Sequence, residues 1–198
     1  MRLALLAAAL LAWASPSLAD EEDSKSHKGQ GLVNLQLGTG YRAIFTYEDE
    51  FCGDLADDGG NATNCAGRKP LVLGIIGGYG VTDSLEVILE LGVGLEGDFG
   101  DRADPDDGPR QFFVAPGIKA YLADLGPTQL FSTVQFVFDF TDFSQLETND
   151  YAIRNINGLQ FDIHRTMGLY AYFGESVGFR NWLSFTVEAG GGIQARFP

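Results

Sequence analysis

The sequence predicts an all-β protein that forms an eight-stranded, antiparallel, up-and-down β-barrel. Apolar residues alternate with polar residues or glycine along repeated stretches of the chain, which is the side-chain period of a strand. Long polar connections alternate with short ones, a pattern typical of neighbouring antiparallel strands. The 198 residues include 26 glycines and 15 phenylalanines. Phenylalanine favours strands and glycine disfavours helix interiors, so both counts support the assignment.

The clearest strand lies at residues 85–95. Its odd positions are apolar throughout, from Leu85 to Leu95, whereas Glu86 and Glu90 occupy even positions. A helix is the competing interpretation, but Gly92 and Gly94 would each cost about 1 kcal/mol in a helix interior. The alternation therefore indicates a strand with one apolar face and one face of acids and glycines.

The same alternation predicts seven further strands, at residues 31–47, 71–82, 110–122, 128–141, 151–163, 168–174 and 182–197. The seventh is ended at Gly174 because Glu175 would otherwise lie on its apolar face. Residues 48–69, 99–109 and 142–150 form long polar loops, and the connections between them are short. All long loops therefore lie at one end of the barrel.

The apolar faces are predicted to point outward, towards lipid. The opposite faces are rich in glycine, which suits the crowded interior of a narrow barrel better than a surface in water. Aromatic residues gather near the strand ends, as in the girdles of transmembrane barrels. The ten steps from Leu85 to Leu95 span about 33 Å, or about 25 Å of membrane at a tilt of about 40°. We therefore expect a transmembrane barrel.

The N-terminus predicts export. Arg2, an apolar run over residues 3–13 and the small residues before Ala19 form a secretory signal peptide, with cleavage after Ala19. Residues 20–30 are charged, lack an apolar pattern and are predicted to be a flexible leader. The barrel domain is then residues 31–197. In an oxidising compartment, Cys52 and Cys65 are expected to form one disulfide.

These features resemble the small outer-membrane β-barrels of Gram-negative bacteria, the group of outer membrane proteins X and W and the membrane domain of outer membrane protein A. The resemblance covers residues 30–197. It implies location in the outer membrane, periplasmic termini and extracellular long loops. It also implies that Phe197 is the C-terminal signal read by the barrel-assembly machinery, although Pro198 follows it here. Outer-membrane lipids, including lipopolysaccharide, are the other expected partners.

Charged residues on the inward faces are expected to form a network in the lumen. The set comprises Arg42, Glu86, Glu90, Glu96, Lys119, Asp139, Arg154, Asp162, Glu188 and Arg196. Buried charges are costly unless they are paired, and the positive and negative charges near each end balance. Glu90 and Glu188 lie near the middle without an obvious partner. Either one of them is protonated, or the stagger of the strands brings an arginine to it.

Catalytic and cofactor sites are not predicted. Barrels of this group that act on lipid A use a histidine with a serine at the outer leaflet, whereas His27 lies in the leader and His164 in a periplasmic turn. The net charge of −14 argues against binding nucleic acid. Acidic loops are the main surface feature. Weak binding of calcium or magnesium is an alternative for one group of aspartates in these loops, Asp101, Asp104, Asp106 and Asp107.

Three functional classes remain open from the sequence. The first is a structural or surface-interaction barrel with a plugged polar lumen and acidic extracellular loops. The second is a narrow channel or a conduit for small or hydrophobic solutes. The third is a soluble exported barrel that binds a ligand inside, in which case the apolar faces would be the core.

Overall fold

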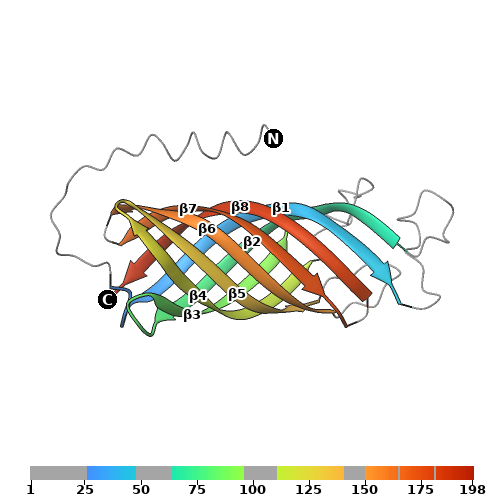
Figure 1. Ribbon diagram of the computed structural model, residues 1–198, viewed down its shortest axis with the longest axis horizontal. Helices are drawn as coiled ribbons and strands as arrows, with labels where there is room; N and C mark the ends of the chain where they lie inside the picture. Colours follow the sequence, from blue (N-terminus) through green and yellow to red (C-terminus); the bar gives the residue numbers. More distant parts are fainter. Residues whose placement is uncertain (1–25, 48–63, 96–110, 141–149, 165, 181) are drawn as a thin grey trace.

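The computed structural model describes residues 26–47, 64–95, 111–140, 150–164, 166–180 and 182–198. These residues form β1 (Gly31–Thr46), β2 (Asn64–Gly80), β3 (Leu85–Gly94), β4 (Phe112–Leu125), β5 (Thr128–Asp139), β6 (Asp150–His164), β7 (Met167–Gly178) and β8 (Trp182–Phe197). Each strand pairs antiparallel with its neighbours in the chain, and β8 pairs with β1, which closes the barrel (Figure 1). The predicted eight-stranded up-and-down architecture is confirmed.

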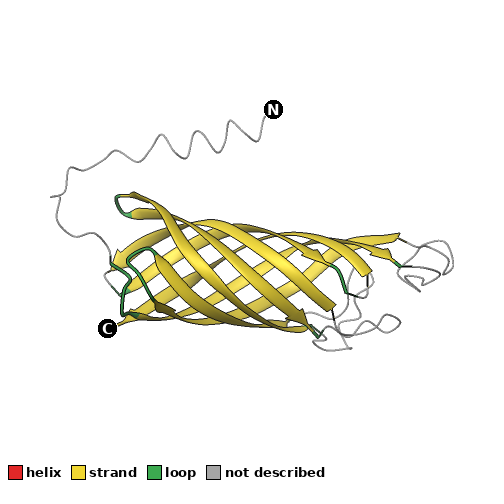
Figure 2. Cartoon of the chain, turned by 60° about the horizontal axis from the view of Figure 1, so that its bottom comes forward, coloured by secondary structure: helices red, strands yellow, loops and turns green. Residues whose placement is uncertain are grey.

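The two ends of the barrel differ in how the strands are connected. The short connections after β2, β4 and β6 lie with the C-terminus at one end, which we call the turn end; the opposite end is the far end (Figure 1). The described turns are the green segments of Figure 2. Between β4 and β5, Gly126 has a φ of 76°, a left-handed conformation that glycine adopts without the steric cost of a Cβ.

The faces of β3 show which side of the sheet is covered. Val87 and Leu89 are 50% and 47% exposed on the outer surface. Glu86 and Glu90 are fully buried inside, together with Ile88. The barrel therefore has an apolar exterior and a polar interior, the reverse of the usual arrangement in water-soluble proteins.

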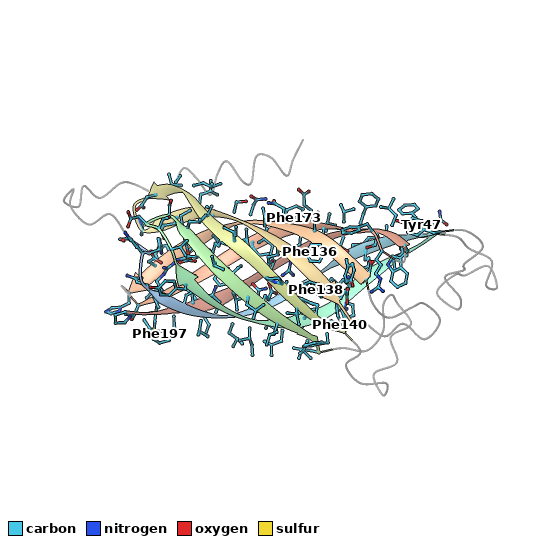
Figure 3. The ribbon with its side chains drawn as sticks, turned by 90° about the horizontal axis from the view of Figure 1, so that it is seen from below. Tyr47, Phe136, Phe138, Phe140, Phe173 and Phe197 are labelled. Atoms are coloured by element: carbon cyan, nitrogen blue, oxygen red, sulfur yellow. The ribbon has the colours of Figure 1, made fainter. Side chains whose placement is uncertain are left out.

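The same inversion extends around the barrel. Figure 3 shows side chains projecting from the outer surface over its whole length, with Phe197 at the turn end and Tyr47 at the far end. Phe136 and Phe138 lie on β5, and Phe140 directly follows the strand. The ring centroids of Phe136 and Phe138 are 5.0 Å apart. Aromatic side chains thus lie near both ends of the outer wall, as predicted.

Two predicted strands are longer in the structure. β2 begins at Asn64 rather than at residue 71, because its first residues pair with β1, from Phe45 opposite Asn64 to Gly40 opposite Lys69. β7 continues to Gly178, so ending it at residue 174 was wrong. Glu175 pairs in register with β6 on one side and β8 on the other, and the hydrogen-bonded ladder continues past it despite the outward carboxylate.

Candidate functional site in the barrel lumen

The central part of the lumen holds four charged side chains in one network, which we call the central network: Lys69, Glu90, Arg154 and Glu188. All four are buried. Arg154 forms ion pairs with both Glu90 and Glu188, the second at 3.4 Å. Lys69 Nζ lies 2.5 Å from Glu188 Oε2. Two cations therefore neutralise two carboxylates, which is the arrangement that burial of charge requires.

Neutral amides complete the hydrogen bonding of the central network. Gln36 Nε2 donates to Glu90 Oε1 at 2.7 Å, and Gln135 Nε2 donates to Glu90 Oε2 at 2.9 Å. Arg154 Nε donates to the Gln135 carbonyl oxygen at 3.0 Å. Each oxygen of Glu90 thus accepts at least one hydrogen bond in addition to the ion pair, so this buried carboxylate is well satisfied.

A separate ion pair lies nearer the far end. Arg42 Nη2 is 3.1 Å from Asp139 Oδ2, and Arg42 Nε donates to Thr186 Oγ1 at 3.1 Å. Phe113 on β4 pairs in register with Asp139 on β5, and its ring centroid lies 4.9 Å from the Arg154 guanidinium of the central network. A cation over an aromatic face gains electrostatic stabilisation from the ring.

A second network occupies the turn end, which we call the turn-end network: His27, Glu86, Tyr121 and Arg196. Arg196 Nη1 lies 2.8 Å from Glu86 Oε1, and its Nη2 donates to the Tyr121 hydroxyl at 2.5 Å. The Tyr121 hydroxyl lies 3.2 Å from Glu86 Oε2 and 3.1 Å from Gln160 Oε1, so its one hydrogen is directed to either of two acceptors. Glu86 therefore lies within reach of the Arg196 guanidinium and the Tyr121 hydroxyl.

Lys119 lies beside the turn-end network, opposite Glu86 of β3, and its nearest contacts are neutral groups. Its Nζ donates to the side-chain oxygens of Gln160 and Gln194 at 3.1 and 3.0 Å. The Phe131 and Tyr121 ring centroids lie 4.4 and 4.7 Å from the same nitrogen. Amide oxygens and aromatic faces thus replace much of the water that an ammonium group would otherwise bind.

His27 comes from the segment before β1 and enters the turn end of the lumen. It is 4% exposed. Its ring stacks on that of Tyr121, with 4.0 Å between the ring centroids and an angle of 3° between the ring planes. Its Nδ1 lies 3.3 Å from Glu86 Oε1. Residues 27–30 also bond to the β2–β3 turn, where the Gly29 N–H donates to the Gly80 carbonyl at 2.8 Å. The end of the predicted leader is therefore packed against the barrel.

Apolar side chains separate the two networks. They form two clusters, Leu32, Ile76 and Ile88 in one, and Phe131, Ile156, Tyr170 and Tyr172 in the other. A cavity of about 20 Å³ lies against both, and Glu90 and Lys119 are among the residues that line it. That volume is enough for about one water molecule.

The predicted site residues fall into three groups. Arg42, Glu86, Glu90, Lys119, Asp139, Arg154, Glu188 and Arg196 are inward and buried, while Asp162 is half-buried at the turn end. Glu90 and Glu188, which had no obvious partner in the sequence, share Arg154 because the stagger of the strands brings it to both. Glu96, Cys52 and the aspartates at 101, 104, 106 and 107 lie outside the described residues. The disulfide stays a prediction, with Cys65 on β2 opposite Ile44.

Sequence reasoning missed three members of the networks. Lys69 was placed in a loop, and the extra strand length that carries it inward had no apolar alternation to indicate it. His27 lies in a segment without any periodic pattern. Tyr121 is on the inward face of a predicted strand, so its direction could be predicted from the sequence. Its contact with Glu86 could not be predicted, because it depends on the register between strands.

Two kinds of feature are absent from the part of the chain that the structure describes. No helix in these ranges is long and apolar enough to cross a membrane. Within the same ranges, no three histidine, cysteine, aspartate or glutamate side chains come together as a metal site.

Comparison with known proteins shows the fold. No protein-family model matches the sequence, and no curated protein sequence matches it. The chain is similar to the N-terminal β-barrel domain of OprF from Pseudomonas aeruginosa, with 14% identity and a TM-score of 0.52 over 86% of this chain and 100% of that one. It is also similar to Neisserial surface protein A (NspA), with 11% identity and a TM-score of 0.53 over the same shares. The chain thus resembles small eight-stranded outer-membrane barrels in fold.

Proposed function

We propose that the protein is an integral outer-membrane β-barrel with a closed lumen, which acts as a structural or surface-interaction protein. The observation that carries this proposal is the apolar exterior. Every strand presents an exposed aliphatic side chain outward: Val33, Ile75, Leu89, Ile118, Val134, Ile153, Leu169 and Val187 on β1 to β8 in order. An apolar surface that includes all eight strands favours contact with lipid over contact with water.

The lumen is proposed to be closed rather than conducting. The central and turn-end networks pair their charges across the barrel, and a cavity of about 20 Å³ lies against the apolar clusters between them. Interiors of eight-stranded barrels are ordinarily filled by side chains. This cavity is far smaller than the roughly 300–1,000 Å³ of a small-molecule site, so it gives no support to a soluble barrel that binds a ligand inside.

The remaining parts of the proposal follow from the sequence and the fold likeness. Residues 1–19 direct export, the turn end with both termini faces the periplasm, and the far end with the acidic loops faces outward. Phe197 ends β8 on the outer surface, where it is 51% exposed and available to the assembly machinery. The protein is proposed to have no catalytic activity, and its lipid partners include lipopolysaccharide.

Gel mobility of the mature chain refolded in detergent tests the membrane assignment. We expect unboiled protein to migrate differently from boiled protein, and circular dichroism to show β-structure only when detergent or lipid is present. A chain that folds in buffer without detergent would overturn the assignment and make the outward apolar residues an interface with something other than lipid.

Conductance across planar bilayers tests the closed lumen. We expect no steady current from the wild-type protein, because the paired charges and packed side chains are proposed to fill the lumen. Reproducible single-channel steps from refolded protein would instead favour the narrow channel, and the membrane assignment would be unaffected by that result.

A further inference from the structure

One part of the outer wall departs from the apolar pattern. Ser132 on β5, Asn155 and Asn157 on β6, and Glu175 on β7 all point outward, and we call these four residues the wall patch. They are neighbours in the sheet, since Asn157 pairs with Ser132 and Asn155 pairs with Glu175. Asn157 and Glu175 are exposed, and the other two are half-exposed.

The wall patch lies within the apolar band and not at its rim. Glu175 is eight residues from the turn-end start of β7, which is about 20 Å along the barrel axis at a rise of about 3.3 Å and a tilt of about 40°. Phe173 and Val177 flank it on the same strand, and Val187 is its partner on β8; these three are 55%, 39% and 48% exposed. Apolar residues therefore surround the carboxylate on three sides.

Hydrogen bonding inside the wall patch is incomplete. Asn157 Nδ2 donates to Asn155 Oδ1 at 2.5 Å, whereas Asn155 Nδ2 reaches Ser132 Oγ and the Thr133 carbonyl only at 3.4 Å. Bonds of 3.4 Å are weak compared with the usual 2.9–3.0 Å. Among the described residues, the side chain of Glu175 has no hydrogen-bond or ion-pair partner. The patch thus offers amide donors beside an unused carboxylate acceptor.

The opposite wall shows that this chain can build a uniformly apolar surface. On β3 the outward residues are aliphatic from Leu85 to Leu95, and on β4 Ile118 and Leu122 continue the apolar surface towards the turn end. Polar and ionisable side chains in contact with lipid are unfavourable and rare, and those that occur mark functional contacts. The wall patch therefore calls for a polar partner within the membrane.

We propose that this partner is a second copy of the chain, bound through the β6–β7 wall in a two-fold dimer. Both copies insert with the same orientation, so the two-fold axis runs along the membrane normal and joins residues of equal depth. Asn155 and Glu175 are cross-strand partners and lie at nearly the same depth. An axis between them brings Glu175 of each copy to Asn155 of the other, and an isologous interface repeats each contact twice.

The donor and acceptor chemistry suits this occupant. A carboxylate accepts hydrogen bonds, and the Asn155 amide can exchange its long bonds for a short, charge-assisted one to the carboxylate. A lipid phosphate would be repelled by Glu175, so the anionic lipids of the outer leaflet do not satisfy the patch. This inference rests on the proposed membrane location of the barrel, and its test separates the two.

Sedimentation equilibrium of the refolded chain in density-matched detergent tests the dimer, with energy transfer between labelled copies in vesicles as a second measurement. We expect the wild-type protein to dimerise. Glu175→Leu is expected to weaken association about tenfold or more, since it removes a hydrogen bond between membrane segments that occurs twice in the dimer. Glu175→Gln keeps acceptor and donor groups and should remain within about threefold of wild type.

Val87→Leu on the opposite wall is the matched control and should leave association unchanged. A heat-dependent gel shift shows that each variant is folded in detergent. If the wild-type protein shows no such shift, the membrane location itself is wrong. A wild-type chain that inserts but remains monomeric in detergent and in vesicles would overturn the dimer. Equal association of the wild type and Glu175→Leu would also overturn the proposal, because the wall patch would then have no part in the dimer.

Discussion

The two networks of the lumen differ in where their charges come from. In the central network, all four charged side chains belong to barrel strands, and each carboxylate has an arginine or lysine partner. The turn-end network also depends on His27, which belongs to no strand, and on the neutral hydroxyl of Tyr121. The central network therefore forms only when the barrel closes, whereas part of the turn-end network can detach while the barrel stays closed.

The largest expected effect is that of Arg154→Met. Both Glu90 and Glu188 lose an ion-pair partner while they remain buried, and breaking a buried pair on one side costs about 3–5 kcal/mol. Urea unfolding in detergent, followed by the fluorescence of the buried Trp182, measures the change in the free energy of unfolding. Arg180→Met is the control, because this arginine is exposed over the Tyr151 ring. A change below about 1 kcal/mol in Arg154→Met would mean that the central network contributes no more than a surface pair.

Arg196→Met is expected to have the next largest effect, about 2–3 kcal/mol. Glu86 loses its 2.8 Å ion pair but keeps the Tyr121 hydroxyl and His27 as neighbours, which limits the loss. The same urea titration measures it. A larger loss than in Arg154→Met would reverse the order of the two networks.

Gly80→Ala tests how the leader is held against the turn end. A Cβ at this position would lie 1.7 Å from the His27 carbonyl oxygen, so the leader backbone must move. We expect a loss of about 1–2 kcal/mol and faster hydrogen exchange at the Gly29 amide, which donates to the Gly80 carbonyl. Gly77→Ala on the same strand is the control, since nothing lies within 4 Å of its added Cβ. Unchanged exchange at Gly29 would show that the leader contact adjusts without cost.

His27→Ala is expected to have the smallest effect, about 0.5–1.5 kcal/mol, because it removes one stacked ring and leaves the Glu86–Arg196 pair in place. His164→Ala at the exposed end of β6 is the matched control. Urea midpoints compare the two variants. An effect of His27→Ala as large as that of Arg196→Met would mean that the leader is an integral part of the closed barrel.

The fold was largely predictable because one face of every strand is nearly uniform. A shift of one residue exchanges the two faces, so alternation fixes both the strand and the side that each residue occupies. The misplaced boundaries occur where this signal fails: β2 begins in a polar segment, and β7 carries Glu175 outward. The lipid-facing wall is predictable only where it is apolar, and the wall patch is the place where it is not.

By itself, the sequence determined the eight-stranded barrel, the outward apolar faces and the set of charges directed inward. The tertiary structure decided which charges meet. Glu90 and Arg154 are 64 residues apart on strands that are not neighbours, and they pair because the stagger of the closed sheet brings them to one level of the lumen. Lys69 reaches Glu188 for the same reason, whereas His27 is positioned by the hydrogen bonds that hold residues 27–30 to residues 80–83. Periodicity reports the face on which a side chain lies, but its depth in the barrel depends on the register of every strand at once.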